Sequence, residues 1–416
     1  MKKIAILSSV LLLGFFAARC SKNPVAPRTN QPPRALTVQE IQLIESDNHF
    51  GLKLFAAVSE AEGDKNVFIS PLSVSMALGM TLNGADGETY TAMKETLELN
   101  GLTEEEINQS YRSLIDLLTN LDYQVVFEIA NSIWYRDTFP IAQAFIDVNR
   151  EYFDADVQGL DFNRSDAADI INGWVKEKTN GKIEKIVKPP ISRAAVMFLI
   201  NAIYFKGDWT YRFDKGKTQD EDFTLIDGST KQVPMMEIED VSFPYYRNED
   251  YQAVELSYGD SLFCMTIVLP HPDRNIDLVI AGLDEQAWTT LTGQLWNITI
   301  DKFEMPKFKL EYEIELNDVL KSLGMEVAFD STRANFSRMR TLPTDTLYIS
   351  KVKHKTFVEV NEEGTEAAAV TSVEMAEATS ANPFSHIRVD RPFIFSIRER
   401  HSGTILFIGK ILDPTV

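Results

Sequence analysis

The chain has 416 residues, of which 44% are hydrophobic and 10% aromatic, and its formal net charge at pH 7 is −20. That apolar content is ample for a large core and excludes an intrinsically disordered chain. An acidic surface repels nucleic acid and anionic lipid headgroups, so we expect neither as a partner.

The first residues predict an export signal. A basic start, MKK, precedes the apolar run IAILSSVLLLGFFAA, which is too short for a comfortable membrane span. The run ends in AARC, which indicates a bacterial lipoprotein signal with Cys20 lipidated after cleavage. Arg19 departs from that pattern, because the position usually holds Gly, Ala or Ser, so plain secretion is the alternative. We expect residues 1–20 to be a signal peptide, and the protein to lie in the cell envelope or outside the cell.

Residues 21–37 contain four prolines and are expected to form a tether. No repeat or linker follows, so residues 38–416 are expected to form one domain. Cys264, in the apolar run LFCMTIVL, is the only other cysteine; we interpret it as a core residue rather than a nucleophile. Without a disulfide framework, stability has to come from the core.

Helical and strand patterns alternate along the whole domain, which favours an α+β fold. Apolar residues at helical spacing predict helices at 103–121, 166–181 and 315–325, the first opening with a capping box at Thr103 and Glu106. Strands are predicted at 127–135, 195–207, 262–270, 297–314, 356–360, 393–399 and 404–412. Many of these strands are almost continuously apolar, so we expect them to be buried on both faces.

Motifs for catalysis or metal binding are missing from the sequence. It has no P-loop, GxGxxG, CxxC, HExxH or GxSxG, and its five histidines lack ligand spacing. We therefore expect neither an enzyme nor a cofactor. An envelope hydrolase whose Ser–His–Asp triad is assembled from distant residues is the alternative, but it has no local signature.

The segment NEEGTEAAAVTSVEMAEATSANPF, residues 361–384, can be interpreted in three ways. From Thr365 to Met375 every second residue is small or apolar, while the charged residues fall in the other set, which predicts a central strand. Gly364 and the small side chains also suit a hinge. A segment that can be both loop and strand is the basis of a switch. On this pattern alone an ordinary surface loop is equally compatible.

Further segments carry a resemblance to a known family. They are NVFISPLSVSMALGMTLNGADGET, INGWVKEKTNGKIEKIV, LINAIYFKGDWTYRF, MPKFKLEYEIELNDVLKSLGM, HKTFVEVNEEG, VNEEGTEAAAVT and RPFIFSIRERHSGTILFIGKILDP. In this order they resemble the serpin family, including its helix B, its helix F, strand 3A and the proximal hinge. The resemblance covers roughly residues 38–416.

The resemblance implies a serpin fold, with three β-sheets, about nine helices and an exposed reactive-centre loop. It also implies a suicide substrate of serine proteases, with the target protease as a covalent partner and a monomeric inhibitor. In this family the protease cleaves the loop, the acyl-enzyme forms, and the loop inserts into the main sheet before deacylation. The small hinge residues favour an inhibitor over a non-inhibitory serpin that acts as a binding or chaperone-like protein.

Family roles carry over to particular residues by motif match. The hinge corresponds to Glu362, Glu363, Gly364, Thr365, Ala367, Ala369 and Thr371. The shutter, which holds the centre of the main sheet, corresponds to Ser70, Ser73, Asn201 and His354. Trp209 and Glu362 correspond to the breach, where the loop first inserts.

The family's usual spacing places the reactive bond between Ala378 and Thr379. A small P1 residue suits the narrow S1 pocket of elastase-like or subtilisin-like proteases. The loop is a few residues longer than in some relatives, so Glu377, Thr379 and Met375 are alternative P1 residues. Trypsin-like targets are disfavoured because no basic residue lies between 355 and 388, and papain-like cysteine proteases are a further alternative.

Overall fold

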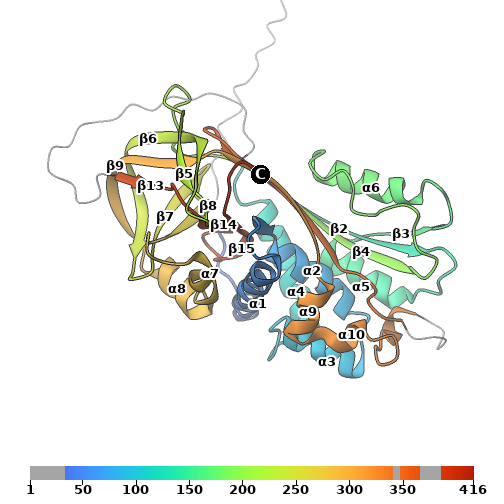
Figure 1. Ribbon diagram of the computed structural model, residues 1–416. Coiled ribbons are helices and arrows are strands. Elements are labelled where there is room, and N and C mark those ends of the chain that lie inside the picture. Colours follow the sequence, from blue (N-terminus) through green and yellow to red (C-terminus); the bar gives the residue numbers. More distant parts are fainter. Residues whose placement is uncertain (1–32, 341–346, 366–385) are drawn as a thin grey trace, which may run out of the picture.

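The computed structural model describes residues 33–340, 347–365 and 386–416, and these residues form an α+β fold (Figure 1). The α-helices are α1 (Val38–Glu62), α2 (Pro71–Leu82), α3 (Gly87–Thr96), α4 (Glu104–Thr119), α5 (Gln143–Phe153), α6 (Ala167–Lys178), α7 (Ile276–Ala281), α8 (Glu285–Gly293), α9 (Asn317–Leu320) and α10 (Glu326–Phe329). Among the described residues, no helix combines the length and the hydropathy needed to span a bilayer.

The described strands belong to two hydrogen-bonded sheets. Six strands form one sheet in the order β10-β11-β12-β4-β2-β3: β2 (Val125–Arg136), β3 (Asp156–Leu160), β4 (Met197–Asp208), β10 (Phe308–Glu315), β11 (Lys353–Val360) and β12 (Gly364–Thr365). Nine strands form the other: β1 (Val67–Ile69), β5 (Gln219–Thr224), β6 (Thr230–Arg247), β7 (Tyr251–Tyr258), β8 (Phe263–Pro270), β9 (Trp296–Pro306), β13 (His386–Arg388), β14 (Phe393–Glu399) and β15 (Ile405–Ile411).

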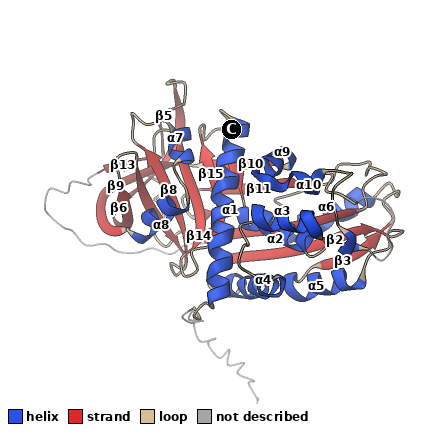
Figure 2. Ribbon diagram, turned by 90° about the horizontal axis from the view of Figure 1, so that it is seen from below, coloured by secondary structure: helices blue, strands red, loops and turns tan. Residues whose placement is uncertain are grey.

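Helices cover both faces of the six-stranded sheet. Figure 1 shows α6 on one side of this sheet and α2, α4 and α5 on the other, and Figure 2 looks onto the side of α1 to α5. Under α6 lies a separate small core, made of Trp134, Phe162, Ala168, Ile171, Val175, Ile183, Val187 and Ile200. The main core fills the opposite side, so the strands of this sheet are enclosed between two layers.

The nine-stranded sheet has two halves that share one long strand. The first part of β6 pairs with β5 and β9, whereas its last three residues, 245–247, pair with β7. The three sheets expected from the family resemblance therefore correspond to the six-stranded sheet and these two joined halves. Every residue of β8, β14 and β15 is buried, which confirms the expectation drawn from their continuous apolar runs.

Local signals in the sequence located some element ends and missed others. The capping box of Thr103 and Glu106 is present at the start of α4. Helix α6 ends at Lys178, before the predicted stop at Gly181. The prediction of one strand over 297–314 was wrong, because the chain leaves the nine-stranded sheet after Pro306 and begins β10 in the other sheet at Phe308. Both halves alternate apolar with polar or charged residues, so the pattern did not reveal the break.

A buried lysine fixes the C-terminal end of α1. Lys410, on β15, is 0% exposed at its side chain and its Nζ lies 3.3 Å from Oδ1 of Asp277 at the start of α7. The same Nζ donates to the carbonyl oxygens of Ser59 at 3.2 Å and Gly63 at 2.8 Å. These carbonyls lie at the negative end of the helix dipole, so the ammonium group satisfies them and joins three elements.

Replacing Lys410 tests how much this side chain contributes to the stability of the fold. Lys410→Met should lower the free energy of unfolding by about 2–4 kcal/mol, because buried carbonyl groups lose their donor. Lys65→Met is the matched control: Lys65 lies just beyond the same helix end but is 70% exposed at its side chain, so its loss should cost less than about 0.5 kcal/mol. Urea midpoints of the native proteins measure both effects. Equal midpoints for the two variants would contradict this account.

Candidate functional site: a partly filled strand position

In the described part of the chain, a central position of the six-stranded sheet is taken by a strand of two residues, β12. β12 lies between β11 and β4. Thr365 pairs with Val360 on β11, and Gly364 and Thr365 pair with Asp208 and Gly207 on β4. Among the described strands β11 and β4 share no ladder of their own. The edges that they turn toward each other therefore extend well past β12, and we call the space between them the slot.

A tight turn brings β12 into this position. The N–H of Asn361 donates to the carbonyl of Gly364 at 3.0 Å, and the N–H of Gly364 donates back to Asn361 at 3.3 Å. Gly364 has a φ of +154°, and a Cβ there would lie 2.2 Å from the carbonyl oxygen of Gly207. Only glycine allows β12 to approach β4 this closely.

Trp209 holds the turn from the β4 side. Its indole Nε1 donates to the carbonyl of Asn361 at 2.9 Å, and its backbone N–H donates to Glu363 at 2.8 Å. The ring stacks on Tyr258, with centroids 4.4 Å apart. The Tyr258 hydroxyl lies 2.7 Å from Oγ1 of Thr365, and burial raises the pKa of this phenol well above its ordinary value. Thr365 thus points into the protein, toward a neutral partner.

Glu362 carries a buried carboxylate that is both hydrogen-bonded and ion-paired. Thr218 donates to its Oε1 at 2.7 Å, and Nζ of Lys307 lies 3.0 Å from its Oε2. Burial acts to raise the pKa of Glu362, but the Thr218 hydrogen bond and the Lys307 ammonium outweigh it and lower the pKa. The neighbouring Glu363 pairs with Lys215. These ion pairs hold the turn at the edge of the core.

Farther along the slot, the first turn of α2 connects β11 to β4. The N–H of Ser70 donates to Nε2 of His354 on β11 at 2.9 Å. Oγ of Ser70 caps the helix by accepting from the N–H of Ser73 at 3.2 Å, and Oγ of Ser73 lies 3.4 Å from the carbonyl of Asn201 on β4. Asn201 in turn donates to Oδ1 of Asn131 on β2 at 2.8 Å. We call Ser70, Ser73, Asn201 and His354 the polar bridge.

The imidazole of the polar bridge is neutral. His354 is buried, and desolvation lowers its pKa from 6.5 to about 4. Because Ser70 donates to Nε2, that nitrogen is the acceptor and carries no proton. Protonation of His354 would remove this acceptor and place a charge in the core.

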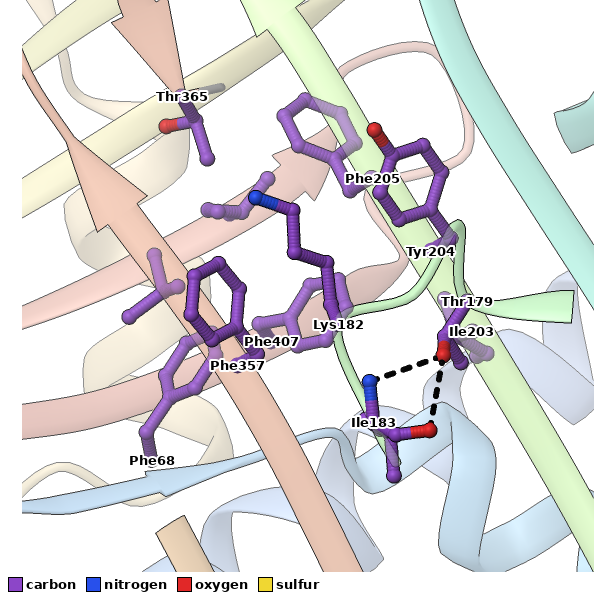
Figure 3. Close-up of a pocket in the computed structure, with 12 residues that line it drawn as sticks. Phe68, Thr179, Lys182, Ile183, Ile203, Tyr204, Phe205, Phe357, Thr365 and Phe407 are labelled. Atoms are coloured by element: carbon purple, nitrogen blue, oxygen red, sulfur yellow. Dashed lines mark hydrogen bonds between the residues drawn. The ribbon is translucent and has the colours of Figure 1, made fainter. Parts of the chain in front are cut away.

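A small pocket lies in the slot next to β12 (Figure 3). Its lining comes from both sheets and from the segment after α6, and consists of Phe68, Thr179, Lys182, Ile183, Ile203, Tyr204, Phe205, Phe357, Val358, Thr365, Ile397 and Phe407. Aromatic rings occupy its inner side. Only small side chains can be added to such a space without displacing the core.

The chain resumes at β13, which belongs to the other sheet. Three residues, 386–388, pair in parallel with β9. Nε2 of His386 lies 2.5 Å from Oε2 of Glu304, and Arg388 pairs with Glu221 at 3.0 Å. Residues 366–385 therefore connect the centre of one sheet to the edge strand of the other.

The structure brings together most of the residues that the sequence singled out. Glu362, Glu363, Gly364, Thr365 and Trp209 meet at the turn, and the four residues of the polar bridge meet at α2. Cys264 is buried and unpaired. The residues Cys20, Ala367, Ala369, Thr371, Met375, Glu377, Ala378 and Thr379 lie outside the described part.

Sequence reasoning missed several partners in this site. Asn131 interrupts the apolar strand FEIANSIWY as Asn201 interrupts its own, and that shared signal could have paired them. Tyr258, Thr218 and Lys307 carry no sequence signal, because their contacts to Thr365 and Glu362 join residues distant in the chain.

Among the described strands, the six-stranded sheet has the two-residue β12 between β11 and β4, and helices lie on both of its faces. In the comparison with known proteins, the family model "Serpin (serine protease inhibitor)" matches residues 45–414. The chain belongs to the serpin family, whose members are mostly serine protease inhibitors.

Individual relatives and structures match over most of the chain. The human leukocyte elastase inhibitor is 34% identical over 384 residues, covering 90% of this chain and 100% of the relative. The thermophilic serpin Tengpin in its native state has a TM-score of 0.81 at 32% identity, covering 92% of this chain and 96% of that structure. Human thyroxine-binding globulin in complex with thyroxine has a TM-score of 0.81 at 27% identity, covering 91% and 100%.

The neutral His354 predicts a dependence of stability on pH. Its pKa is about 4 in the folded protein and 6.5 as the ordinary value, so the unfolded chain binds the proton more tightly. Neutral His354 therefore contributes up to about 3 kcal/mol to the free energy of unfolding. This contribution is complete above about pH 6.5 and is lost as the pH falls toward 4. His354→Asn should therefore flatten the fall in unfolding midpoint between pH 7 and 4.5. His401→Asn, at an exposed histidine, should leave the wild-type slope unchanged; equal slopes in all three proteins would contradict the assignment.

Proposed function

We propose that this serpin is an irreversible inhibitor of serine proteases with a narrow S1 pocket, elastase-like or subtilisin-like, and acts by inserting its cleaved loop into the slot. The observation that carries the proposal is β12, which lies between β11 and β4 at the start of the segment that would insert. We further propose that the protein is a monomer and needs no cofactor. We expect it to be exported, and to be either anchored through Cys20 or secreted.

The register of β12 predicts where the next residues would go. Continuing its pairing with β11 and β4 places Thr371 opposite His354 on one side and opposite Asn201 on the other. A threonine hydroxyl can both donate and accept, so it matches a site whose two walls carry a neutral imidazole and an amide. The polar bridge would be replaced there by contacts to the inserted strand.

Small residues fit the inner side of the slot. In the same register Ala367 and Ala369 would face the interior, where Phe68, Phe205 and Phe407 line the pocket. Each new strand residue can bond to both neighbours, at roughly 1 kcal/mol net per hydrogen bond. Together with burial of the inward side chains, insertion would release on the order of 10 kcal/mol.

The proposed trapping begins with cleavage of the loop. The protease serine attacks the carbonyl carbon of Ala378, an ester forms, and the new amino terminus at Thr379 leaves. If 13 further residues then enter the sheet at about 3.3 Å each, the ester moves about 40 Å along the sheet with the protease attached. Inhibition results when insertion is faster than hydrolysis of the ester.

Thr365→Arg is expected to convert the protein from an inhibitor into a substrate. Thr365 is 3% exposed and bonded to Tyr258, so an arginine cannot occupy its place without expelling β12. Thr365→Val keeps the shape and loses only the hydroxyl, so it should still form a covalent complex. Both are scored on denaturing gels as the ratio of complex to cleaved protein. Undiminished complex with Thr365→Arg would contradict insertion through this position.

The target class is tested with a protease panel. The protein is mixed in turn with elastase, subtilisin, a glutamyl endopeptidase, trypsin and papain, and the released C-terminal fragment is weighed by mass spectrometry. We expect a covalent complex with elastase or subtilisin and a fragment that begins at Thr379. A complex with the glutamyl endopeptidase would identify Glu377 as the P1 residue. A complex with papain would identify cysteine proteases as the target class. Cleavage by all five without a complex would refute the inhibitory function and favour a non-inhibitory serpin.

A further inference from the structure

The outer side of the slot is covered by the segment that follows α6. Thr179 caps this helix end, and its Oγ1 accepts from the N–H of Ile183 at 3.0 Å. Nδ2 of Asn172, on α6, donates to the carbonyl of Val187 at 2.8 Å, and its Oδ1 accepts from the N–H of Val187 at 2.9 Å. Lys176 pairs with Glu184 at 2.8 Å. These contacts bind the segment to α6, so the two are expected to move together.

One side chain of this segment reaches across the slot to β11. Nζ of Lys182 lies 4.8 Å from the centre of the Phe357 ring. Figure 3 shows Lys182 between Phe357 on β11 and Tyr204 on β4, close to the end of β12 at Thr365. Lys182 is half-buried, so its attraction to the ring is less screened by water than that of a surface lysine.

The same ring binds a second lysine, from within the sheet. Nζ of Lys309 on β10 lies 5.4 Å from the Phe357 centroid. β10 and β11 are paired over eight register positions, so Lys309 and Phe357 belong to one rigid unit. Of the two cation contacts to this ring in the described structure, that of Lys182 comes from the α6 side. Moving α6 away from the sheet would break the Lys182 contact and leave the Lys309 contact intact.

We propose that Lys182 and Phe357 form a latch over the slot, and that opening of this latch limits the rate at which a strand inserts between β11 and β4. The proposal rests on the proposed function. An inserted strand directs every second side chain outward, and at the level of Phe357 and Tyr204 the outward space is taken by Lys182. The ammonium group therefore has to leave the ring before insertion can pass this level.

The latch makes a kinetic prediction. A contact present in the closed state and broken in the transition state slows the step; for cation–π contacts this amounts to about two- to thirtyfold in rate. Lys182→Met keeps the aliphatic stem and removes the charge, so it should speed insertion within that range. Lys182→Arg retains a cation that stacks on aromatic rings, so it should restore a rate near that of the wild type.

Insertion can be timed without any trapped protease. Thermolysin cleaves the loop of the full protein, and gel samples taken in parallel give the time at which the cleavage occurs. Tryptophan fluorescence follows the change in the surroundings of Trp209 when the strand inserts. The lag between the nick and the fluorescence change is the insertion time. Lys185→Met is the matched control, because Lys185 lies in the same segment but is exposed and has no ring contact among the described residues. It should leave the insertion time unchanged.

A double-mutant cycle separates a latch from a general loosening of the sheet. Phe357→Leu should also speed insertion, and adding Lys182→Met to it should give no further gain, because the two residues share one contact. Additive effects, or an unchanged insertion time in Lys182→Met, would overturn the latch while the wild type still traps proteases. A wild type that neither traps a protease nor changes after the nick would refute both the latch and the proposed function.

Discussion

The hydrogen-bonding edges that β11 and β4 turn toward each other are the constraint on which the rest of this structure depends. β12 pairs with the edge of β4 over two residues and with the edge of β11 at Thr365. Farther along, the strands are connected only indirectly in the described structure, through Ser70 and Ser73 at the first turn of α2. A sheet whose inner strands have backbone N–H and C=O groups without sheet partners is higher in free energy than a sheet in which these groups are paired. Covering helices and side-chain bridges are what keep it in this arrangement.

The two ends of the slot use different electrostatics for a physical reason. At the turn, Glu362 lies at the edge of the core, where Lys307 reaches it from a partly exposed position, so a charge can be held. At the polar bridge His354 is buried and its partners are neutral, so a charged imidazole would cost more than its contacts return. His354 therefore stays neutral and acts through a hydrogen bond. Ionic contacts secure the turn, and neutral contacts join the two strands.

The serpin fold by itself does not determine which molecule the protein binds. The leukocyte elastase inhibitor and thyroxine-binding globulin both match nearly the whole chain, although their names describe an elastase inhibitor and a thyroxine-binding protein. The described structure shows a sheet in which β12 separates β11 from β4, a turn that leads into β12, and β13, where the chain resumes. Under the proposed function, the choice of protease would depend on the residues between β12 and β13, by the usual complementarity of a P1 side chain to an S1 pocket.

The sequence by itself determined the α+β class, the buried strands, the capping of α4 and, through its motifs, the turn and the polar bridge, because these depend on local pattern or on short segments. It could not show that 297–314 divides between two sheets, since both halves have the alternating apolar and polar pattern of a strand. Only the tertiary structure decided that Tyr258 bonds Thr365, that Lys307 neutralises Glu362, and that Lys182 lies over Phe357. Each of these contacts joins residues far apart in the chain, and distances between such residues are set by packing rather than by any local pattern.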